Sequence, residues 1–502
     1  MNYDVLAMKK DFQSKNSSVE SQSGKQTIPR QTTGGVTPLS FAQQRMWFSQ
    51  QLDPTSPVYN VFRTWRVLCA LDIEVLKSAL QTIVRRHNVL RAMIQVIDGA
   101  PQQVIVESLT IELPVVDLRG CSSEDLQTVC KESIQQEVRR PFDLTQGPLF
   151  VAKLWRLGDE DHVILLCAHH IIADGWSFGV LYKEIGALYE AITDGKSSPL
   201  PDLPFQYGDY AVEQRNSLEG ARLENLLGYW KKQLADLTPL QLPTDRSGAS
   251  WSTFRGEREG FSLGQALTAG LKSLSQNEGV TLFTTLLSCF KVLLSRYSGQ
   301  TDIAVGTFKH GRTHREVEPL IGMFVNTLVL RSDLSGNPRF RELLQDVRKT
   351  CKGAFAHEEL PFDRLIDEFQ PERKLGRNPL FQVAINYQQT GQSPTLPGLA
   401  VSPFAVGNVG SYQLGNDTAK FDLELSLFVS ENEVQGMMEY STDVLDRTTV
   451  RRAIAHLRTL IEAVVADPER RVAELPLLGG AERQQLLADW NATETAYPRD
   501  AT

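Results

Sequence analysis

Apolar residues in the first half of the chain follow two kinds of spacing. Residues 72–94 carry apolar side chains three or four positions apart, which predicts a helix with one buried face: Val75, Leu76, Leu80 and Ile83. The segment DHVILLCAHH (161–170) is almost continuously apolar, as in a strand covered on both faces. Helical spacing returns in residues 176–192, so we expect a strand, a loop and a helix in succession.

The second half repeats this alternation of helix and strand. A long apolar helix is predicted at 282–297, and the strand-like DIAVGTF (302–308) follows it. In FDLELSLFV (421–429), apolar and polar residues alternate with the period of two that marks a half-buried strand. The segment VQGMMEYS (434–441) is expected to pair with it across a turn, and a helix at 445–466 to close this half.

Two Pro-rich connectors, 195–205 and 238–256, interrupt these elements, and we place a boundary between two α/β lobes near the second. We expect the lobes at 37–237 and 238–470, each a mixed sheet covered by helices. Residues 1–36 contain a long stretch rich in Ser, Gln, Thr and Gly. They are expected to form a flexible head or a docking element for another protein.

The composition narrows the class of protein without identifying it. The chain has 502 residues and a formal net charge of −8, so it offers no basic footprint for nucleic acid. Its six cysteines are scattered without a C-x-x-C pair, which favours free thiols in a reducing cytoplasm over disulfides or a zinc site. The sequence contains no run of about 18 apolar residues, so no membrane span is predicted. The N-terminus lacks the pattern of a secretory signal.

The stretch CAHHIIADGWSFGV (167–180) carries the candidate chemistry. Its Gly-Trp-Ser-Phe-Gly fits the G-x-S-x-G pattern of serine hydrolases, which need the serine on a sharp turn between strand and helix. Here eight residues separate Ala168, where the apolar strand stops, from Ser177. We therefore place Ser177 in the first helical turn, where its hydroxyl can serve a free backbone N–H, and expect Ser177→Ala to keep full activity.

The paired histidines permit further interpretations. A metal site would crowd His169, His170 and Asp174 into six residues, a spacing that is not typical of zinc or iron, and no second cluster supports it. Buried histidines satisfied by hydrogen bonds are the structural alternative. A strand end is where functional loops collect, and this favours one histidine facing a cavity while its neighbour and the aspartate hold the loop.

This HHxxxDG motif resembles the signature of the condensation domains of non-ribosomal peptide synthetases, relatives of chloramphenicol acetyltransferase. Further stretches are similar to the family's other motifs and follow the same order: SFAQQRMWF (40–48), RHNVLRAMI (86–94), YGDYAVEQ (207–214), IGMFVNTLVLR (321–331), HEELPFDRLI (357–366) and RNPLFQV (377–383). Glu213 stands where an aromatic residue is more usual. The tail LLADWNATETAYPRD resembles the linker toward an adenylation domain, so residues 471–502 are assigned to that linker.

The resemblance implies an α/β fold of two acetyltransferase-like lobes in a V, with a tunnel between them that phosphopantetheine arms enter. His170 would face this tunnel while an acceptor α-amine attacks a donor thioester, giving an amide and a free thiol. A neutral imidazole, with a pKa near ~6.5, can take the proton of the attacking nitrogen. Three roles stay open for His170: it can act as a general base, stabilise the tetrahedral intermediate, or only orient the amine.

The resemblance also implies supporting roles. Asp174 would form a partly buried ion pair with Arg312 from the other lobe, so Asp174→Ala is expected to give poorly soluble protein. Gly175 would let a pantetheine arm pass, and His169 would be a structural histidine. Three residues are possible tunnel residues: Trp176, Ser177 and Asn326.

The intact histidines and the opening motif argue against a heterocyclising or epimerising activity. The sequence contains no P-loop motif, so we expect no use of ATP. Because the chain begins at Met1 with a short head, we expect a starter condensation domain that takes its donor from acyl-CoA or an acyl carrier. The alternatives are an elongation domain supplied by a separate upstream peptidyl carrier, and a non-catalytic scaffold that binds carriers. Downstream carrier and adenylation domains are the expected partners. Phosphopantetheine or CoA would belong to the substrates, and the domain would bind no metal or cofactor of its own.

Overall fold

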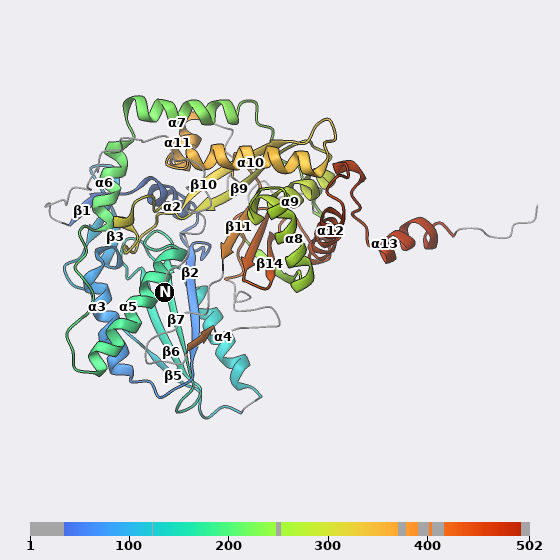
Figure 1. The fold of residues 1–502 in the computed structure, drawn as a ribbon. Coiled ribbons are helices and arrows are strands. Elements are labelled where there is room, and N and C mark those ends of the chain that lie inside the picture. Colours follow the sequence, from blue (N-terminus) through green and yellow to red (C-terminus); the bar gives the residue numbers. More distant parts are fainter. Residues whose placement is uncertain are drawn as a thin grey trace, which may run out of the picture. The chain divides into compact units, whose positions relative to one another are not determined.

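The computed structural model describes residues 35–122, 124–246, 253–369, 378–389, 401–403 and 416–492. Most of the predicted head, residues 1–34, lies outside these residues, as does Arg377 of the RNPLFQV stretch. Helices and strands alternate in both halves of the chain, which confirms the predicted α/β class (Figure 1).

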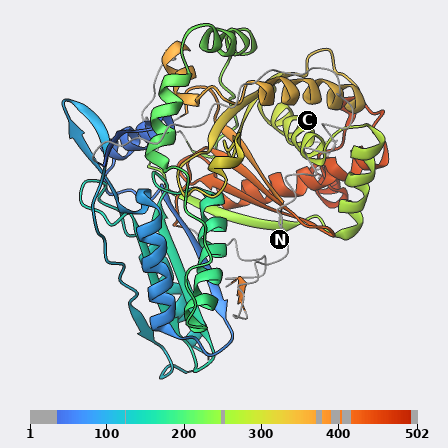
Figure 2. The ribbon, with the colours of Figure 1, turned by 60° about the vertical axis from the view of Figure 1, so that its left-hand side comes forward.

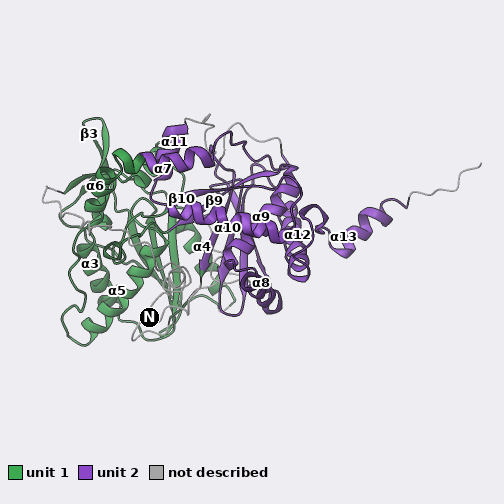
Figure 3. Cartoon of the chain, turned by 45° about the horizontal axis from the view of Figure 1, so that its top comes forward, with its two compact units in different colours: residues 1–223, 310–325, 389–406 green, residues 224–309, 326–388, 407–502 purple. Residues whose placement is uncertain are grey.

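The chain forms two compact units (Figure 3). Unit 1 comprises residues 1–223, 310–325 and 389–406, and unit 2 comprises residues 224–309, 326–388 and 407–502. The predicted lobes are continuous stretches of chain, whereas these units are not, and the predicted lobe boundaries stay a prediction.

Unit 1 is built on a five-stranded sheet in the order β12-β2-β7-β6-β5. Its strands, in that order, are Val401–Pro403, Asn60–Val67, His162–His169, Phe150–Arg156 and Val115–Asp117. Strand β7 pairs antiparallel with both β2 and β6, and all its residues are buried, which confirms the predicted strand. The sheet is mixed because β5 runs parallel to β6.

Helices cover both faces of this sheet. Figure 1 shows α3 (Ile73–Arg86) and α5 (Gly175–Thr193) on one face and α4 (Leu126–Val138) on the other. The helix predicted over 72–94 is too long, because the backbone is extended at His87. The buried His87 ring bonds to Glu184 on α5, 2.9 Å away, and this tertiary contact ends the helix. The chain then runs through a short 3₁₀ turn, Asn88–Arg91, into a strand.

That strand, β3 (Ala92–Ile97), belongs to a second, three-stranded sheet of unit 1 in the order β1-β4-β3. Its other strands are β1 (Val36–Pro38) and β4 (Ala100–Ile105). Helix α2 (Phe41–Leu52) follows β1 in the chain, and helix α6 (Tyr207–Ser217) packs against β1.

Unit 2 holds a six-stranded mixed sheet in the order β10-β9-β11-β13-β14-β8. Its strands, in that order, are Asn326–Asp333, Asp302–Lys309, Val383–Gln389, Leu423–Val429, Val434–Ser441 and Gly256–Ser262. Strands β13 and β14 pair antiparallel, as the sequence predicts. Four helices pack together against the sheet (Figure 2): α8 (Gln265–Asn277), α9 (Leu282–Ser298), α10 (Phe340–Ala356) and α12 (Arg447–Ala466).

The remaining helices of unit 2 are shorter or lie outside this group. Helix α7 (Gly220–Gln233) spans the change from unit 1 to unit 2, and α11 (Phe362–Phe369) precedes β11. After α12 come a 3₁₀ turn (Val472–Glu474) and α13 (Gly480–Gln484), followed by a short π-helical segment, Gln485–Asp489. None of the described helices is by itself long and apolar enough to cross a membrane.

Candidate active site

The HHxxxDG loop joins the end of β7 to the start of α5 within unit 1. Asp174 is the N-cap of α5: its carboxylate accepts a hydrogen bond from the Ser177 backbone N–H at 2.8 Å. In return, the Ser177 hydroxyl accepts from the Asp174 N–H at 3.2 Å, which completes a capping box. The helix therefore begins in the Asp-Gly-Trp-Ser sequence, as predicted, and the capping box fixes the residue at which the loop ends.

The ring of His170 is held by its own loop. Its Nδ1 lies 2.8 Å from the carbonyl oxygen of Ala173, and its backbone N–H donates to the Tyr59 carbonyl at 2.7 Å. A carbonyl oxygen can only accept, so Nδ1 carries the proton and Nε2 is the basic nitrogen of the neutral ring. The side chain is partly exposed. A basic nitrogen with a fixed tautomer is the arrangement that proton transfer requires.

His169 is placed differently from its neighbour. It is only 1% exposed, and its Nδ1 accepts a hydrogen bond from the Ile171 N–H at 3.1 Å. Its ring centre lies 6.0 Å from that of Tyr59 and 6.3 Å from that of Phe142. These are the contacts of a packed side chain that supports the loop.

Asp174 and Arg312 form an ion pair at 2.6 Å, and both side chains are 0% exposed. The sequence predicts a partly buried pair with an arginine from the other lobe, whereas the structure buries the pair completely. Arg312 also belongs to unit 1, because residues 310–325 pack there although β9 and β10 on either side belong to unit 2.

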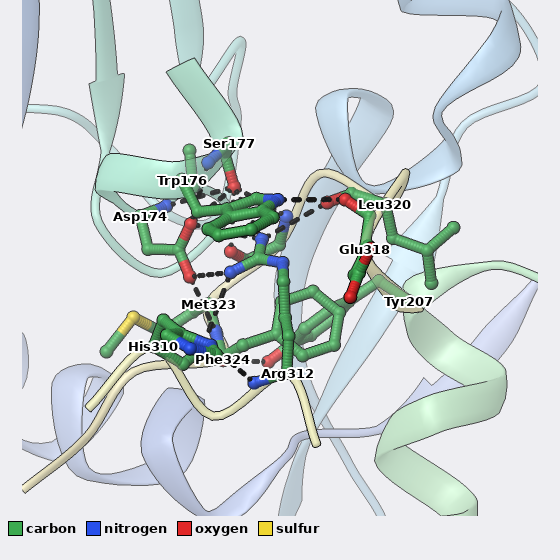
Figure 4. A network of polar contacts seen from close by, with 12 residues as sticks. Asp174, Trp176, Ser177, Tyr207, His310, Arg312, Glu318, Leu320, Met323 and Phe324 are labelled. Carbon is green, nitrogen blue, oxygen red and sulfur yellow. Dashed lines mark hydrogen bonds and ion pairs between the residues drawn. The ribbon is translucent and has the colours of Figure 1, made fainter. Parts of the chain in front are cut away.

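The pair lies in a dense polar network, which Figure 4 shows. A second nitrogen of Arg312 donates to Asp174 at 3.1 Å and to the Leu320 carbonyl at 3.1 Å, and the Phe324 N–H donates to Asp174 at 3.2 Å. Burial by itself would raise the pKa of Asp174. The charge of Arg312 and the hydrogen bonds from Arg312 and Ser177 outweigh burial and hold this pKa below its ordinary value.

Close packing fixes the segment that carries Arg312. Gly311 has φ +63°, and a Cβ built on it would lie 1.9 Å from the Phe324 carbonyl oxygen. A Cβ on Gly322 would lie 2.0 Å from the ring of Tyr207. The Tyr207 hydroxyl donates to the Met323 carbonyl at 2.6 Å. No sequence spacing reveals this last contact, since 116 residues separate its partners.

Ser177 is fully buried within this network rather than presented as a nucleophile. Its Oγ lies 2.8 Å from the carboxylate of Asp174 and 3.0 Å from the Gly322 carbonyl, and it accepts from the Gly322 N–H at 3.1 Å. These bonds predict a loss of stability in Ser177→Ala, while the expectation that this variant keeps full activity stays a prediction. A serine with this many partners holds the helix start and the 310–325 segment together.

The other predicted site residues divide between the units. Trp176 is partly buried, and its indole N–H donates to the Glu318 carbonyl at 2.9 Å (Figure 4). Gly175 is exposed, and a Cβ there would meet only Arg63 Nη2, at 4.0 Å. Asn326 lies in unit 2, where its side-chain nitrogen donates to the carbonyls of residues 358 and 360 and its oxygen accepts from two backbone N–H groups. These bonds are those of a structural side chain.

Comparison with known proteins extends this picture to the whole chain. The family model described as "Condensation domain" matches residues 34–487. The chain is 44% identical to one of the linear gramicidin synthase subunits of Brevibacillus parabrevis and 43% identical to chondramide synthase cmdD of Chondromyces crocatus, in each case over 92% of its own length. It spans only 9% and 12% of those proteins.

Solved structures of low sequence identity share the fold. The X-domain from teicoplanin biosynthesis superposes with a TM-score of 0.81 at 24% identity, over 90% of this chain and all of that one. The starter condensation domain of rhizomide synthetase RzmA superposes with a TM-score of 0.76 at 20% identity, over 89% of this chain and 98% of that one. With a family model that matches nearly all of its length, this chain belongs to the condensation-domain family of non-ribosomal peptide synthetases.

Proposed function

We propose that this chain forms amide bonds between two thioester-bound substrates. The α-amine of an aminoacyl group, held on a carrier domain, attacks the carbonyl carbon of a donor thioester. A C–N bond forms, the C–S bond breaks, and the donor's pantetheine or CoA leaves as a free thiol. The observation that carries this proposal is the 2.8 Å contact between His170 Nδ1 and the Ala173 carbonyl oxygen, from which we infer that Nδ1 carries the proton and Nε2 is basic.

His170 is proposed as the catalytic residue that handles the proton of the attacking nitrogen. An α-ammonium has a pKa near ~8 and is largely non-nucleophilic at neutral pH, whereas imidazole has a pKa near ~6.5. Nε2 takes the proton as the C–N bond forms, and the resulting imidazolium can return it to the departing thiolate. General acid–base help of this kind is worth roughly 10²- to 10⁴-fold.

The surrounding residues are proposed to support this step without touching the reacting atoms. Asp174 and Arg312 hold the end of the loop through their buried pair. Gly175 is proposed to leave room for a pantetheine arm, and its exposed position supports this role because packing does not require a glycine there. Pantetheine or CoA enters as part of the substrates.

Carrier and adenylation domains are the proposed partners, because the relatives named above are far longer proteins of which this chain matches one part. The proposed compartment is the cytoplasm, where the aminoacyl and acyl thioesters would be supplied.

Mass spectrometry of the acceptor carrier tests the function directly. An aminoacyl-loaded carrier is mixed with a donor thioester and the intact carrier mass is followed. We expect His170→Ala to lower the rate of amide formation by about 10²-fold or more, with an unchanged unfolding temperature. His170→Asn is the matched control, since its amide can still donate to Ala173 but offers no basic nitrogen. If His170→Asn keeps the wild-type rate, the base role is wrong.

The same assay separates two types of donor. The starter type, predicted from the sequence, would accept acyl-CoA or an acyl carrier. The elongation type would need a peptidyl carrier. Product from acyl-CoA alone would favour the starter type, and product only with a peptidyl carrier the elongation type.

A further inference from the structure

Gln43 lies in helix α2 and is 0% exposed. Its side-chain nitrogen donates to the carbonyl oxygen of Ile171 at 3.0 Å and to Gln103 Oε1 at 3.1 Å. Its side-chain oxygen accepts from the Ser40 N–H at 3.0 Å, which completes the capping box of α2. One buried amide thus joins the start of α2 to the HHxxxDG loop, 128 residues further along the chain.

Chemistry fixes which way this amide faces. The Ser40 N–H can only donate, so the oxygen of Gln43 must face it, and the Ile171 carbonyl can only accept, so the nitrogen must face that. Both hydrogens of the nitrogen are used, one for Ile171 and one for Gln103. A rotated or shifted side chain would leave buried polar groups unsatisfied, and for this reason the orientation is rigid.

The Ile171 carbonyl, which accepts from Gln43, lies in the turn that determines where the Ala173 carbonyl is placed. It belongs to the peptide between Ile171 and Ile172, inside the turn that returns Ala173 to His170. The bond between His170 Nδ1 and the Ala173 carbonyl spans this turn. If the Ile171 peptide rotates, the Ala173 carbonyl moves away from Nδ1, and both the tautomer and the direction of Nε2 are no longer fixed.

Gln103, on β4, accepts one of the two hydrogens of the Gln43 amide. Its own nitrogen donates to the Thr37 hydroxyl at 3.1 Å, and it is 1% exposed. Gln103 therefore resembles Gln43 in residue type, burial and membership of the network, but none of the bonds described for it reaches the loop. It provides a natural comparison.

We propose that Gln43 is a positioning residue for the reaction: by holding the Ile171 carbonyl, it fixes the tautomer of His170 and the direction in which Nε2 points. This inference rests on the proposed function of His170. It assigns to the SFAQQ stretch, which resembles the opening motif of the family, a role in catalysis through the loop rather than in capping α2 alone.

A double-mutant cycle tests the proposal. Gln43→Met and Gln103→Met are made in the wild-type chain and in the His170→Ala chain, and initial rates are measured over a range of substrate concentrations to give kcat and KM. We expect Gln43→Met to lower kcat by about 10- to 100-fold with little change in KM, because a small misplacement of a catalytic group costs this much. Gln103→Met should stay within about threefold of the wild-type kcat, because the Ser40 N–H and the Ile171 carbonyl still orient the Gln43 amide.

In the His170→Ala background, Gln43→Met should add almost no further loss, because its effect passes through the missing imidazole. Multiplied losses would overturn the proposal, as would a Gln103→Met variant that is impaired as strongly as Gln43→Met.

If Gln43→Met does not fold, Gln43→Glu replaces it. As a neutral acid the new side chain can still donate one bond to Ile171, and as a carboxylate it cannot. Its kcat should therefore fall with rising pH relative to the wild type at equal folded fraction, and a parallel pH profile would overturn the proposal.

A measurement without turnover separates this inference from the proposed function. Long-range ¹H–¹⁵N spectra of the histidines report the His170 tautomer directly. We expect the Nδ1–H form in the wild type and in Gln103→Met, and a mixture of tautomers in Gln43→Met. If the wild type makes no amide, the proposed function fails; if Gln43→Met retains the Nδ1–H form, the positioning role fails.

Discussion

On folding, the carboxylate of Asp174 loses its contacts with water and accepts hydrogen bonds from protein groups instead. Arg312, the Ser177 N–H and the Phe324 N–H all donate to it, and the charge pair is fully buried. Taking two charges out of water is expensive, and the cost is repaid only while both partners are present. Removing one member of the pair is therefore strongly destabilising, because the other charge then stays buried without its partner.

We expect Asp174→Asn to lower the free energy of unfolding by about 3–5 kcal/mol, because it leaves the Arg312 charge buried and uncompensated. Denaturant unfolding at pH 7 measures this loss. The exposed pair Asp346–Lys349 supplies the control, since Asp346→Asn should cost less than about 1 kcal/mol.

The folded-state pKa of Asp174 is depressed, so its contribution is present at neutral pH and is lost as pH falls below the unfolded value near ~4. The difference between wild type and Asp174→Asn should therefore shrink in acid. A difference that is constant from pH 7 to 3 would contradict the assignment.

Lys291 is a charged residue in the helix that the sequence predicts as long and apolar, α9. It is 0% exposed, and its Nζ donates to the Leu330 carbonyl at 2.8 Å and to the Ser332 hydroxyl at 2.6 Å. Burial lowers the pKa of Lys291 to about 7, against smaller opposing contributions from Cys351 and Asp302. The amine is thus half-neutral near physiological pH.

This lowered pKa makes stability depend on pH in a definite direction. Above pH 7 the folded chain releases the proton while the unfolded chain keeps it, so stability rises with pH. Relative to Lys291→Met, the wild type should gain about 1–2 kcal/mol between pH 7 and 8.5. Urea unfolding at several pH values provides the measurement, and parallel curves for the two proteins would refute the shift.

At the scale of elements, the start of α5 shows how a short sequence builds a site. The apolar run of β7 ends at His169, and Asp174 caps the helix five residues later, so the loop between them has little freedom. Strand, loop and helix were all predictable from the pattern of residues 161–193, because β7 and α5 have strong and different periods.

Ser177→Ala tests this helix start. We expect the free energy of unfolding to fall by about 1–3 kcal/mol, because Asp174 and Gly322 lose a buried partner, while turnover per folded molecule is retained. Chemical denaturation and the carrier-mass assay, run on the same preparation, separate the two effects. Loss of turnover with unchanged stability would instead favour the serine-hydrolase interpretation.

At the scale of the whole molecule, the path of the chain is the feature that local sequence patterns reveal least. Residues 310–325 leave unit 2 after β9, pack in unit 1 and return at β10. The segment 471–484, which is predicted to be part of a linker, packs with unit 2, and the linker role stays a prediction. His456 on α12 bonds to Glu482 at 2.8 Å and to the Tyr297 hydroxyl at 2.8 Å.

The fastening of this segment can be tested by proteolysis. His456→Ala removes the partner of Glu482, so we expect trypsin to cleave after the exposed Arg483 about fivefold faster, which corresponds to one hydrogen bond of about 1 kcal/mol. Arg452→Ala, on an exposed position of the same helix, is the control and should leave the cleavage rate unchanged. Equal rates for all three proteins would show that the bond does not hold α13.

The sequence by itself determined the α/β class, the strands and helices with strong periods, and the position of His170 at the end of a buried strand. These follow from local periodicity and from capping chemistry, which act over a few residues. Tertiary structure decided the complete burial of the Asp174–Arg312 pair and the hydrogen bond from Gln43 to the Ile171 carbonyl. Such contacts join residues as far as 138 positions apart, and only the packed fold brings them within hydrogen-bond distance.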